Sequence, residues 1–323
     1  MAIPLSHYFW LTGGFFIGMF FMYNVVPFRI TNHHQSGNNL HIRQDPPNNV
    51  LKFGNPGPIS DLFQRTAYTA SFNRRDRIPH WVGEHLTAES LRRGQNVSRD
   101  KSRFTGDKAV PGLFRVYTND YTNSGYDRGH MAPAGDAVSS QTAMDETFLL
   151  TNIAPQVGPG FNRQYWAYLE QFCRDLTKNF TDVYVYSGPL FLPQLVTTHA
   201  SSSSEAYALA DSKIEFDEDG AIKVISKVSN TKDRYRMQYD MIGANGPTIA
   251  VPTHYFKILL VSNGTDYASG AFVLPNQAID HAIPLDRFLV DLRAIEKASG
   301  LTFFQSLDRT TFTKLCDLVR CIV

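Results

Sequence analysis

Four consecutive residues, Asp127, Arg128, Gly129 and His130, restrict the fold and chemistry of this chain more than any other feature. Side chains alternate between the two faces of a β-strand, so a strand here places Arg128 and His130 on one face and Asp127 and Gly129 on the other. One face then carries an imidazole beside a permanent cation. The sequence therefore predicts a strand that presents candidate catalytic side chains.

A helix is predicted to begin near Asn162. Pro and Gly are absent from there to Ser187, and apolar or aromatic residues recur at a spacing of three and four, which is typical of a helix packed against a core. These residues are Trp166, Leu169, Phe172, Cys173 and Leu176. Asn162 and Glu170 differ in direction by about 80° at about 100° per residue, so both can face one groove. Asn162 can also be the helix N-cap, because asparagine is preferred there, and a side chain at the start of a helix can still face the groove.

The motifs resemble, in order and spacing, the DNA/RNA non-specific endonucleases of the ββα-metal (His-Me finger) superfamily, and within it the mitochondrial endonuclease G family. They are the DRGH strand, the N-x-x-P-Q segment from Asn152 and the N-x-x-x-W-x-x-x-E helix from Asn162. Further similar stretches, spread from about residue 50 to the C-terminus, begin at Phe53, Ala143, Ser187, Ala250 and Ile283. The resemblance implies an α/β fold of the α+β type, the ββα-metal nuclease fold, with a central antiparallel or mixed sheet flanked by helices.

The resemblance also implies the site residues. His130 is expected to be the general base that takes a proton from the attacking water, and Asn162 the single protein ligand of Mg²⁺ or Mn²⁺. A neutral amide oxygen, with water and phosphate oxygens in the other positions, suits Mg²⁺. Glu170 is expected to hold metal-bound waters, and Arg128 to lie next to the scissile phosphate.

Two further residues follow from the same resemblance. Asn152 matches an asparagine near the base that either orients the base or binds phosphate, and both roles stay open. Arg99 is the best match for a second active-site arginine, with Arg92, Arg93 and Arg103 as alternatives. The implied reaction is hydrolysis of DNA and RNA phosphodiesters, without sequence preference, to products with 5′-phosphate and 3′-hydroxyl ends.

Structural interpretations are favoured for three other residues. His254, in Pro-Thr-His-Tyr-Phe, is expected to be a hydrogen-bonded structural histidine. Asp127 is expected to be a structural carboxylate behind the strand rather than a metal ligand, and Trp166 to belong to the core rather than to a base-stacking platform.

Charge and cysteine content exclude some classes of protein. The formal net charge is only +1, so the whole chain is not basic, but arginines cluster before the motif, and phosphate binding needs only such a local patch. Three cysteines rule out a disulfide scaffold and a thiolate zinc cluster. Cys173 is expected to be buried, and Cys316 and Cys321 can pair if the chain between them turns back.

Pattern breaks predict three parts: an N-terminal membrane anchor or targeting segment (residues 1–30), a polar linker (31–50) and a nuclease domain (51–323). Within the domain, residues 196–233 exceed the connection usual in the family and predict an inserted surface loop, with a hairpin around 217–220. Strands are predicted at 182–188, 248–252 and 256–261, and helices at 285–299 and 310–319.

Residues 8–26 contain no Asp, Glu, Lys or Arg and are long enough, at about nineteen residues, to cross a bilayer. They lack the positive start of a secretory signal and the arginines of a matrix presequence, so a membrane anchor is predicted. The resemblance then implies a homodimer at the mitochondrial inner membrane, facing the intermembrane space, that binds DNA and RNA through their backbones.

Two alternatives to this interpretation remain. One is a secreted non-specific nuclease, whose sequons at Asn96, Asn179 and Asn263 would carry glycan. The other is a non-catalytic nucleic-acid-binding or partner-binding protein on a nuclease-like fold. Loss of the motif His, Asn or Arg would favour this second alternative, and all three are present.

Overall fold

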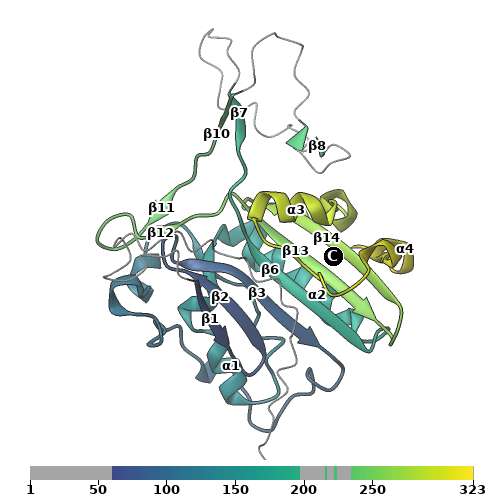
Figure 1. The fold of residues 1–323 in the computed structure, drawn as a ribbon. Coiled ribbons are helices and arrows are strands. Elements are labelled where there is room, and N and C mark those ends of the chain that lie inside the picture. The colour runs from purple at the N-terminus through teal and green to yellow at the C-terminus, as the bar shows by residue number, and fades with distance from the viewer. Residues whose placement is uncertain (1–59, 197–214, 217–221, 224–233, 323) are drawn as a thin grey trace, which may run out of the picture. The chain divides into compact units, whose positions relative to one another are not determined.

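The computed structural model describes residues 60–196, 215–216, 222–223 and 234–322 (Figure 1). All of them belong to one unit, Pro56–Val323. The predicted anchor, the predicted linker and most of the predicted insertion lie outside the described residues. Within the described ranges, no helix has both the length and the apolar character needed to cross a membrane.

A seven-stranded sheet forms the centre of the domain. Its neighbouring strands are antiparallel, except for the last pair, which is parallel. In spatial order the strands are β1 (Ser60–Gln64), β2 (Tyr68–Asn73), β3 (Ile78–Leu86), β6 (Asp182–Leu190), β13 (His254–Ser262), β14 (Tyr267–Pro275) and β15 (Thr313–Lys314). The predicted fold class and the predicted strands at 182–188 and 256–261 are confirmed.

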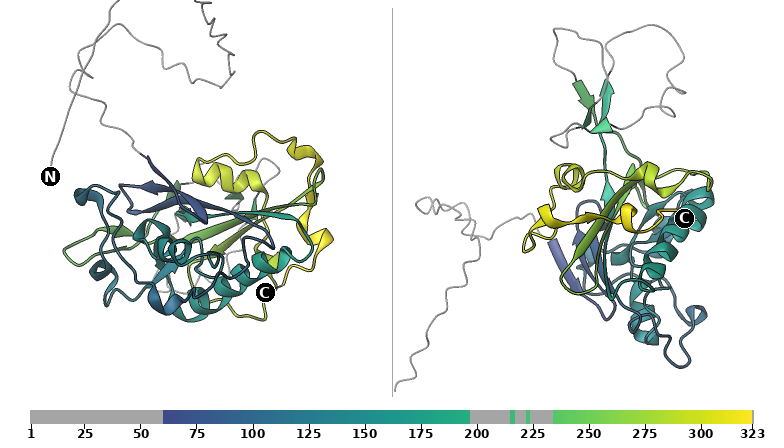
Figure 2. Two further views of the ribbon diagram at one scale, coloured as in Figure 1. Left: turned by 90° about the horizontal axis from the view of Figure 1, so that it is seen from below. Right: turned by 90° about the vertical axis from the view of Figure 1, so that its right-hand side faces the viewer.

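Helices cover both faces of the sheet, as the two views of Figure 2 show. On β13, Tyr255 and Leu259 pack in one cluster with α2 (Trp166–Leu176), while Phe256 and Ile258 pack in another with α3 (Leu292–Ser299). Because both faces of β13 are buried, its sequence does not alternate, and between Tyr255 and Val261 every residue except the buried Lys257 is apolar or aromatic.

A two-stranded ribbon lies beside α2. β4 (Asp127–His130) pairs antiparallel with β5 (Ile153–Gln156), and His130 lies opposite Ile153. The short helix α1 (Gln141–Thr147) and the 3₁₀ turn η5 (Leu150–Asn152) lie in the connection between the two strands. The strand predicted at the DRGH motif is therefore confirmed.

The predicted helix after this ribbon begins in a wide turn, Gly158–Tyr165, that continues into α2. In this turn the Asn162 amide donates to the Val157 carbonyl at 2.9 Å. Gly160 has φ +80°, and a Cβ there would lie 2.5 Å from Ala278 Cβ, so only glycine fits. The Asn162 side chain does not cap the helix, because its Nδ2 donates to Asp127 of the ribbon instead.

The C-terminal helices are shorter than predicted. The helix predicted over 285–299 is a 3₁₀ turn, Leu285–Phe288, followed by α3. Between them the Val290 amide donates to the carbonyl of Ala271 on β14, and this bond keeps the segment extended. The predicted 310–319 helix is reduced to a 3₁₀ turn (Arg309–Thr311), β15 and the single turn α4 (Leu315–Leu318). Here pairing with β14 outweighs helix propensity.

Smaller predictions have mixed outcomes. The strand predicted at 248–252 is reduced to β12 (Ile249–Ala250), paired with β11 (Met241–Ile242). Cys173 is buried, as predicted, and Cys316 and Cys321, whose pairing the sequence left open, form a disulfide.

Short strands mark the predicted insertion. β7 (Gln194–Val196) pairs with β10 (Arg234–Arg236) at its two ends. β8 (Glu215–Phe216) pairs with β9 (Ile222–Lys223) on either side of the predicted hairpin turn.

Candidate active site

His130 lies at the end of β4 with only 8% of its surface exposed. Its ring packs against Phe104 and Phe148, at centroid distances of 5.3 and 5.0 Å, and these two rings lie 4.9 Å from each other. Burial, and then the charge of Arg99, lower the pKa of His130 to about 3. The imidazole is therefore neutral at neutral pH and can accept a proton. Its Nε2 is buried and has no hydrogen-bond partner in the described part of the chain.

Two arginines lie over the rings that pack against this histidine. The Arg128 guanidinium lies 5.3 Å from the Phe104 ring centroid, and the Arg99 guanidinium lies 5.3 Å from that of Phe148. Nη2 of Arg128 donates to the Thr118 carbonyl at 3.2 Å. Each cation thus lies over one of the two rings that pack against the imidazole, and two positive charges near a neutral base suit an anionic substrate.

The structure distinguishes Arg99 from the three arginines considered as alternatives. Arg92 forms an ion pair with Glu89 at 2.9 Å, Arg93 donates to the Val97 carbonyl, and Arg103 donates to backbone carbonyls of its own turn. Arg99 begins the 3₁₀ turn Arg99–Lys101, and its charge acts on both His130 and Glu170.

Asn152 is fully buried in η5, and its amide is saturated by backbone groups. Oδ1 accepts from the Ala132 amide at 3.0 Å, and Nδ2 donates to the carbonyls of Ala132 and Thr147 at 2.8 and 2.9 Å. The Met131 amide also donates to the Asn152 carbonyl at 3.0 Å. This geometry holds the backbone directly after His130 and leaves no amide hydrogen of Asn152 for phosphate. It favours the orienting role.

Asn162 contacts the opposite end of the same strand. Its Nδ2 donates to Oδ2 of Asp127 at 2.9 Å, and Arg163 donates to both oxygens of that carboxylate at 2.7 Å. Arg163 and then Asn162 lower the pKa of Asp127 against the effect of burial. The carboxylate therefore stays ionised and fixes which amide atom of Asn162 points away from it.

A divalent cation fits this arrangement. Because Nδ2 is held by Asp127, the oxygen is the amide atom of Asn162 that remains for a metal, and neutral oxygen ligands suit Mg²⁺ and Mn²⁺. Across the described ranges, no three His, Cys, Asp or Glu side chains cluster as a metal centre. A site built on one amide is of a different kind from such a cluster.

Glu170 lies on α2, two helical turns beyond Asn162. Burial raises the pKa of Glu170 to about 7, against the lowering effect of Lys257 and, further down, of Arg99. The charge of Arg99 thus reaches both Glu170 and His130.

Buried charges lie behind α2. Lys257, on β13, is 1% exposed, and its Nζ donates to Ser187 Oγ at 2.6 Å. Arg174, one turn after Glu170, forms an ion pair with buried Asp136 at 2.6 Å. Burial, and then Asp136, raise the pKa of Glu84 well above its usual value. These groups tie the site helix to the sheet.

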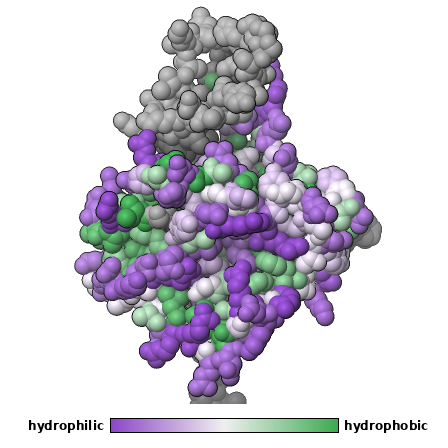
Figure 3. All heavy atoms as spheres, turned by 180° about the vertical axis from the view of Figure 1, so that it is seen from behind, coloured by the Kyte–Doolittle hydropathy of each residue, from purple (hydrophilic) through white to green (hydrophobic). Residues whose placement is uncertain are grey.

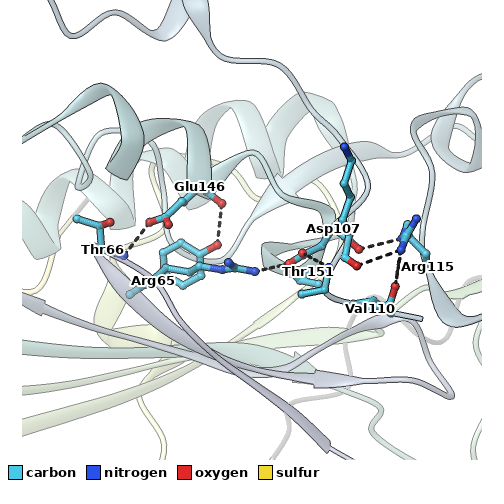
Figure 4. A network of polar contacts seen from close by, with 10 residues as sticks. Arg65, Thr66, Asp107, Val110, Arg115, Glu146 and Thr151 are labelled. Carbon is cyan, nitrogen blue, oxygen red and sulfur yellow. Dashed lines mark hydrogen bonds and ion pairs between the residues drawn. The ribbon is translucent and has the colours of Figure 1, made fainter. Parts of the chain in front are cut away.

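A polar network fixes the segment that leads from Arg99 toward the ribbon (Figure 4). The buried carboxylate of Asp107 pairs with Arg65 and accepts from Thr151 Oγ1 at 2.8 Å, next to Asn152. Arg115 donates to the backbone carbonyls of Asp107 and Val110. The loop before the motif is thus tied to β1–β2 and to η5, so Phe104 has a fixed place against His130.

The residues with structural interpretations lie as expected. His254 shares a hydrogen bond of 2.9 Å with Thr253 Oγ1, and burial lowers the pKa of His254 to about 4. Trp166 is 1% exposed within the main core.

Sequence reasoning missed several residues of the site. The sequence could have pointed to Arg174, because it follows Glu170 by one helical turn. No sequence pattern pointed to Phe104, Phe148 or Lys257, because only the tertiary fold brings them to His130 and α2. On the α2 side of the sheet, Figure 3 shows a mainly hydrophilic surface with scattered apolar groups, as suits a polar substrate.

Comparison with known proteins agrees with this geometry. The family model for DNA/RNA non-specific endonucleases matches residues 46–310. A nuclease of Syncephalastrum racemosum is 54% identical over 275 residues, which cover 85% of this chain and 77% of that protein. The mitochondrial nuclease of Saccharomyces cerevisiae is 41% identical over 281 residues, covering 85% and 75%.

A solved structure agrees as well. The crystal structure of the EndoG/EndoGI complex contains a chain that is 38% identical, with a TM-score of 0.65, and the match covers 82% of this chain and 94% of that one. The chain belongs to the DNA/RNA non-specific endonuclease family and is a hydrolase of that kind.

Proposed function

We propose that this endonuclease cuts phosphodiesters with His130 as general base and one divalent ion, Mg²⁺ or Mn²⁺, held by Asn162. The observation that carries the proposal is the neutral, buried imidazole packed against Phe104 and Phe148, with an arginine guanidinium over each of these rings. A base must be unprotonated before the reaction, and burial keeps His130 so.

Each side chain of the site has a separate role in this proposal. His130 accepts the proton of the attacking water, while Arg128 and Arg99 hold the phosphate and balance the charge that grows on it. Asn152 keeps the backbone after His130 in place. When bound, the divalent ion supplies charge stabilisation at the phosphate and at the departing 3′ oxygen. The products then carry 5′-phosphate and 3′-hydroxyl ends.

Glu170 is proposed to order the water shell around the cation site. Burial raises its pKa, and a divalent cation bound nearby would favour the ionised form, which accepts hydrogen bonds from the water shell. The site touches the nucleic-acid backbone rather than base edges in this proposal, which accounts for activity on both DNA and RNA without sequence preference.

The test compares His130→Ala with His254→Ala. Both histidines are largely buried with lowered pKa, but only His130 packs against the rings that carry Arg99 and Arg128, so His254→Ala is a matched control. Plasmid and RNA cleavage should fall about 10²–10⁴-fold for His130→Ala and stay within about threefold of wild type for His254→Ala. Chelator should stop cleavage by the wild type, and ligase should reseal its nicks without added kinase.

Retention of more than about a tenth of the wild-type turnover by His130→Ala would identify another residue as the base. Nicks that ligase seals only after kinase treatment would contradict the proposed 5′-phosphate ends.

We further propose a homodimer located at the mitochondrial inner membrane and facing the intermembrane space. The yeast relative is named as a mitochondrial nuclease, which supports the organelle. A secreted nuclease is the alternative. Of its sequons, Asn263 has its amide bonded to Asn179 and Thr181 backbone groups, so Asn96 is the better-placed glycan acceptor to monitor.

A further inference from the structure

Trp166 occupies a central place between the groups of the site. It is the first residue of α2, one turn after Asn162 and one turn before Glu170. Its indole Nε1 donates to the backbone carbonyl of His130 at 3.2 Å. One side chain therefore joins the helix that carries Asn162 and Glu170 to the strand end that carries the base.

The indole is held firmly in this place. Phe161 and Tyr255 pack against it at centroid distances of 5.7 and 5.6 Å, and Trp166 is 1% exposed. The Lys257 ammonium lies 4.5 Å from its ring centroid. A desolvated cation over an indole is a favourable contact, so the ring has no easy alternative rotamer.

Core packing alone does not account for this geometry. A buried indole N–H needs some acceptor, and many carbonyls would serve. Here the acceptor is the carbonyl of His130 itself, and the N–H of the same peptide, on Met131, is already bonded to the Asn152 carbonyl, so the indole fixes the other side of this peptide. A shift of that peptide turns the Cα–Cβ bond of His130 and moves the imidazole. Misplacement of a catalytic group by about 1 Å can cost about 10²-fold in rate.

We propose that Trp166 is a positioning residue for His130: its indole N–H holds the His130 peptide, and with it the imidazole, in register with the helix that carries Asn162 and Glu170. This inference rests on the proposed role of His130 as base. Lys257 and the two neighbouring rings keep the indole in the orientation that makes the hydrogen bond.

The test removes the N–H while keeping the ring. Trp166→Phe keeps an aromatic ring, and replacement of Trp166 by 3-benzothienylalanine keeps the full bicyclic shape with sulfur in place of N–H. Tyr255→Phe is the matched control, because it removes a buried hydrogen bond of 2.6 Å to the Pro155 carbonyl on the neighbouring strand β5. For each full-length protein, kcat, KM, the Mn²⁺ dissociation constant and the melting temperature are measured, beside His130→Ala.

We expect kcat to fall about tenfold in both Trp166 variants, with KM and the Mn²⁺ dissociation constant within about twofold of wild type. Tyr255→Phe should lower the melting temperature about as much as the Trp166 variants do, and it should keep the wild-type kcat. The benzothienyl protein guards against a folding defect in Trp166→Phe, because its ring fills the same volume.

Three outcomes would overturn the inference. Wild-type kcat in the benzothienyl protein would show that the ring alone suffices. An equal loss of kcat in Tyr255→Phe would show general loosening of the ribbon. A parallel loss of Mn²⁺ affinity would place the effect on Asn162. Failure of the base assignment is separate: it appears as substantial activity in His130→Ala, and it would remove both proposals.

Discussion

Asp127→Ala should weaken Mn²⁺ binding about 10–100-fold while costing little folding stability. In the wild type, Asp127 Oδ2 holds Nδ2 of Asn162 at 2.9 Å, so the amide oxygen is fixed as the atom free to bind a cation. Without the carboxylate, the amide can turn, and a metal must select the productive orientation.

The magnitudes separate the metal effect from the stability effect. A loss of 10–100-fold in affinity is about 1.4–2.7 kcal/mol of binding free energy. The ion pair that is lost at the same time, Asp127 with Arg163, has side-chain exposures of 21% and 59%. Exposed pairs of this kind contribute about 0–1 kcal/mol to the free energy of unfolding. The variant should therefore remain folded and bind metal poorly.

Isothermal titration with Mn²⁺ and thermal unfolding of the purified protein measure the two quantities. Arg163→Gln is the control, because it breaks the ion pair and keeps the hydrogen bond between Asp127 and Asn162. Its Mn²⁺ affinity should stay within about threefold of wild type. An unchanged affinity in Asp127→Ala, or equal losses in the two variants, would refute the reasoning.

The remaining predictions concern metal, pH, assembly and location. Asn162→Ala should lower activity and raise the Mg²⁺ concentration needed, and Glu170→Gln should act more weakly in the same direction; an unchanged titration for Asn162→Ala would place the metal ligand elsewhere. Because the pKa of folded His130 is about 3, below its unfolded value of about 6.5, the stabilisation it gives is complete above pH 6.5 and is lost as the pH falls. Between pH 7 and 5, the free energy of unfolding should therefore drop about 2 kcal/mol more in wild type than in His130→Ala, as denaturant titrations would measure. Light scattering at micromolar concentration should give a dimer mass, and a monomer mass would contradict the dimer. Full-length protein should co-fractionate with mitochondrial membranes through residues 8–26 and resist protease until the outer membrane is ruptured, whereas glycosylated protein in the endoplasmic reticulum would favour the secreted alternative.

Local patterns were sufficient to predict the strand and the helix of the site. The alternation at Arg128 and His130 and the periodicity after Asn162 are properties of a few neighbouring residues, and β4 and α2 follow them. Prediction was wrong where distant pairing decided the outcome, because a helix expected over 310–319 gives way to β15 against β14. A propensity worth tenths of a kcal/mol per residue does not withstand such pairing.

The sequence by itself determined the family, the order of the motifs and the candidates His130, Arg128, Asn162 and Glu170. These depend on residue types at short spacings, which a linear chain displays directly. It also determined the chemistry open to them, since an imidazole, an amide and a carboxylate carry their properties with them.

Only the tertiary structure decided how these groups are tuned. The low pKa of His130 comes from burial and then from Arg99, and part of that burial comes from Phe104 and Phe148, which lie far from it in sequence and pack against it in the fold. The orientation of the Asn162 amide depends on a carboxylate thirty-five positions earlier, on β4. Burial and hydrogen bonding are properties of a packed interior, and no spacing along the chain contains them, because the solvent around each group is removed only when the sheet and α2 close over it.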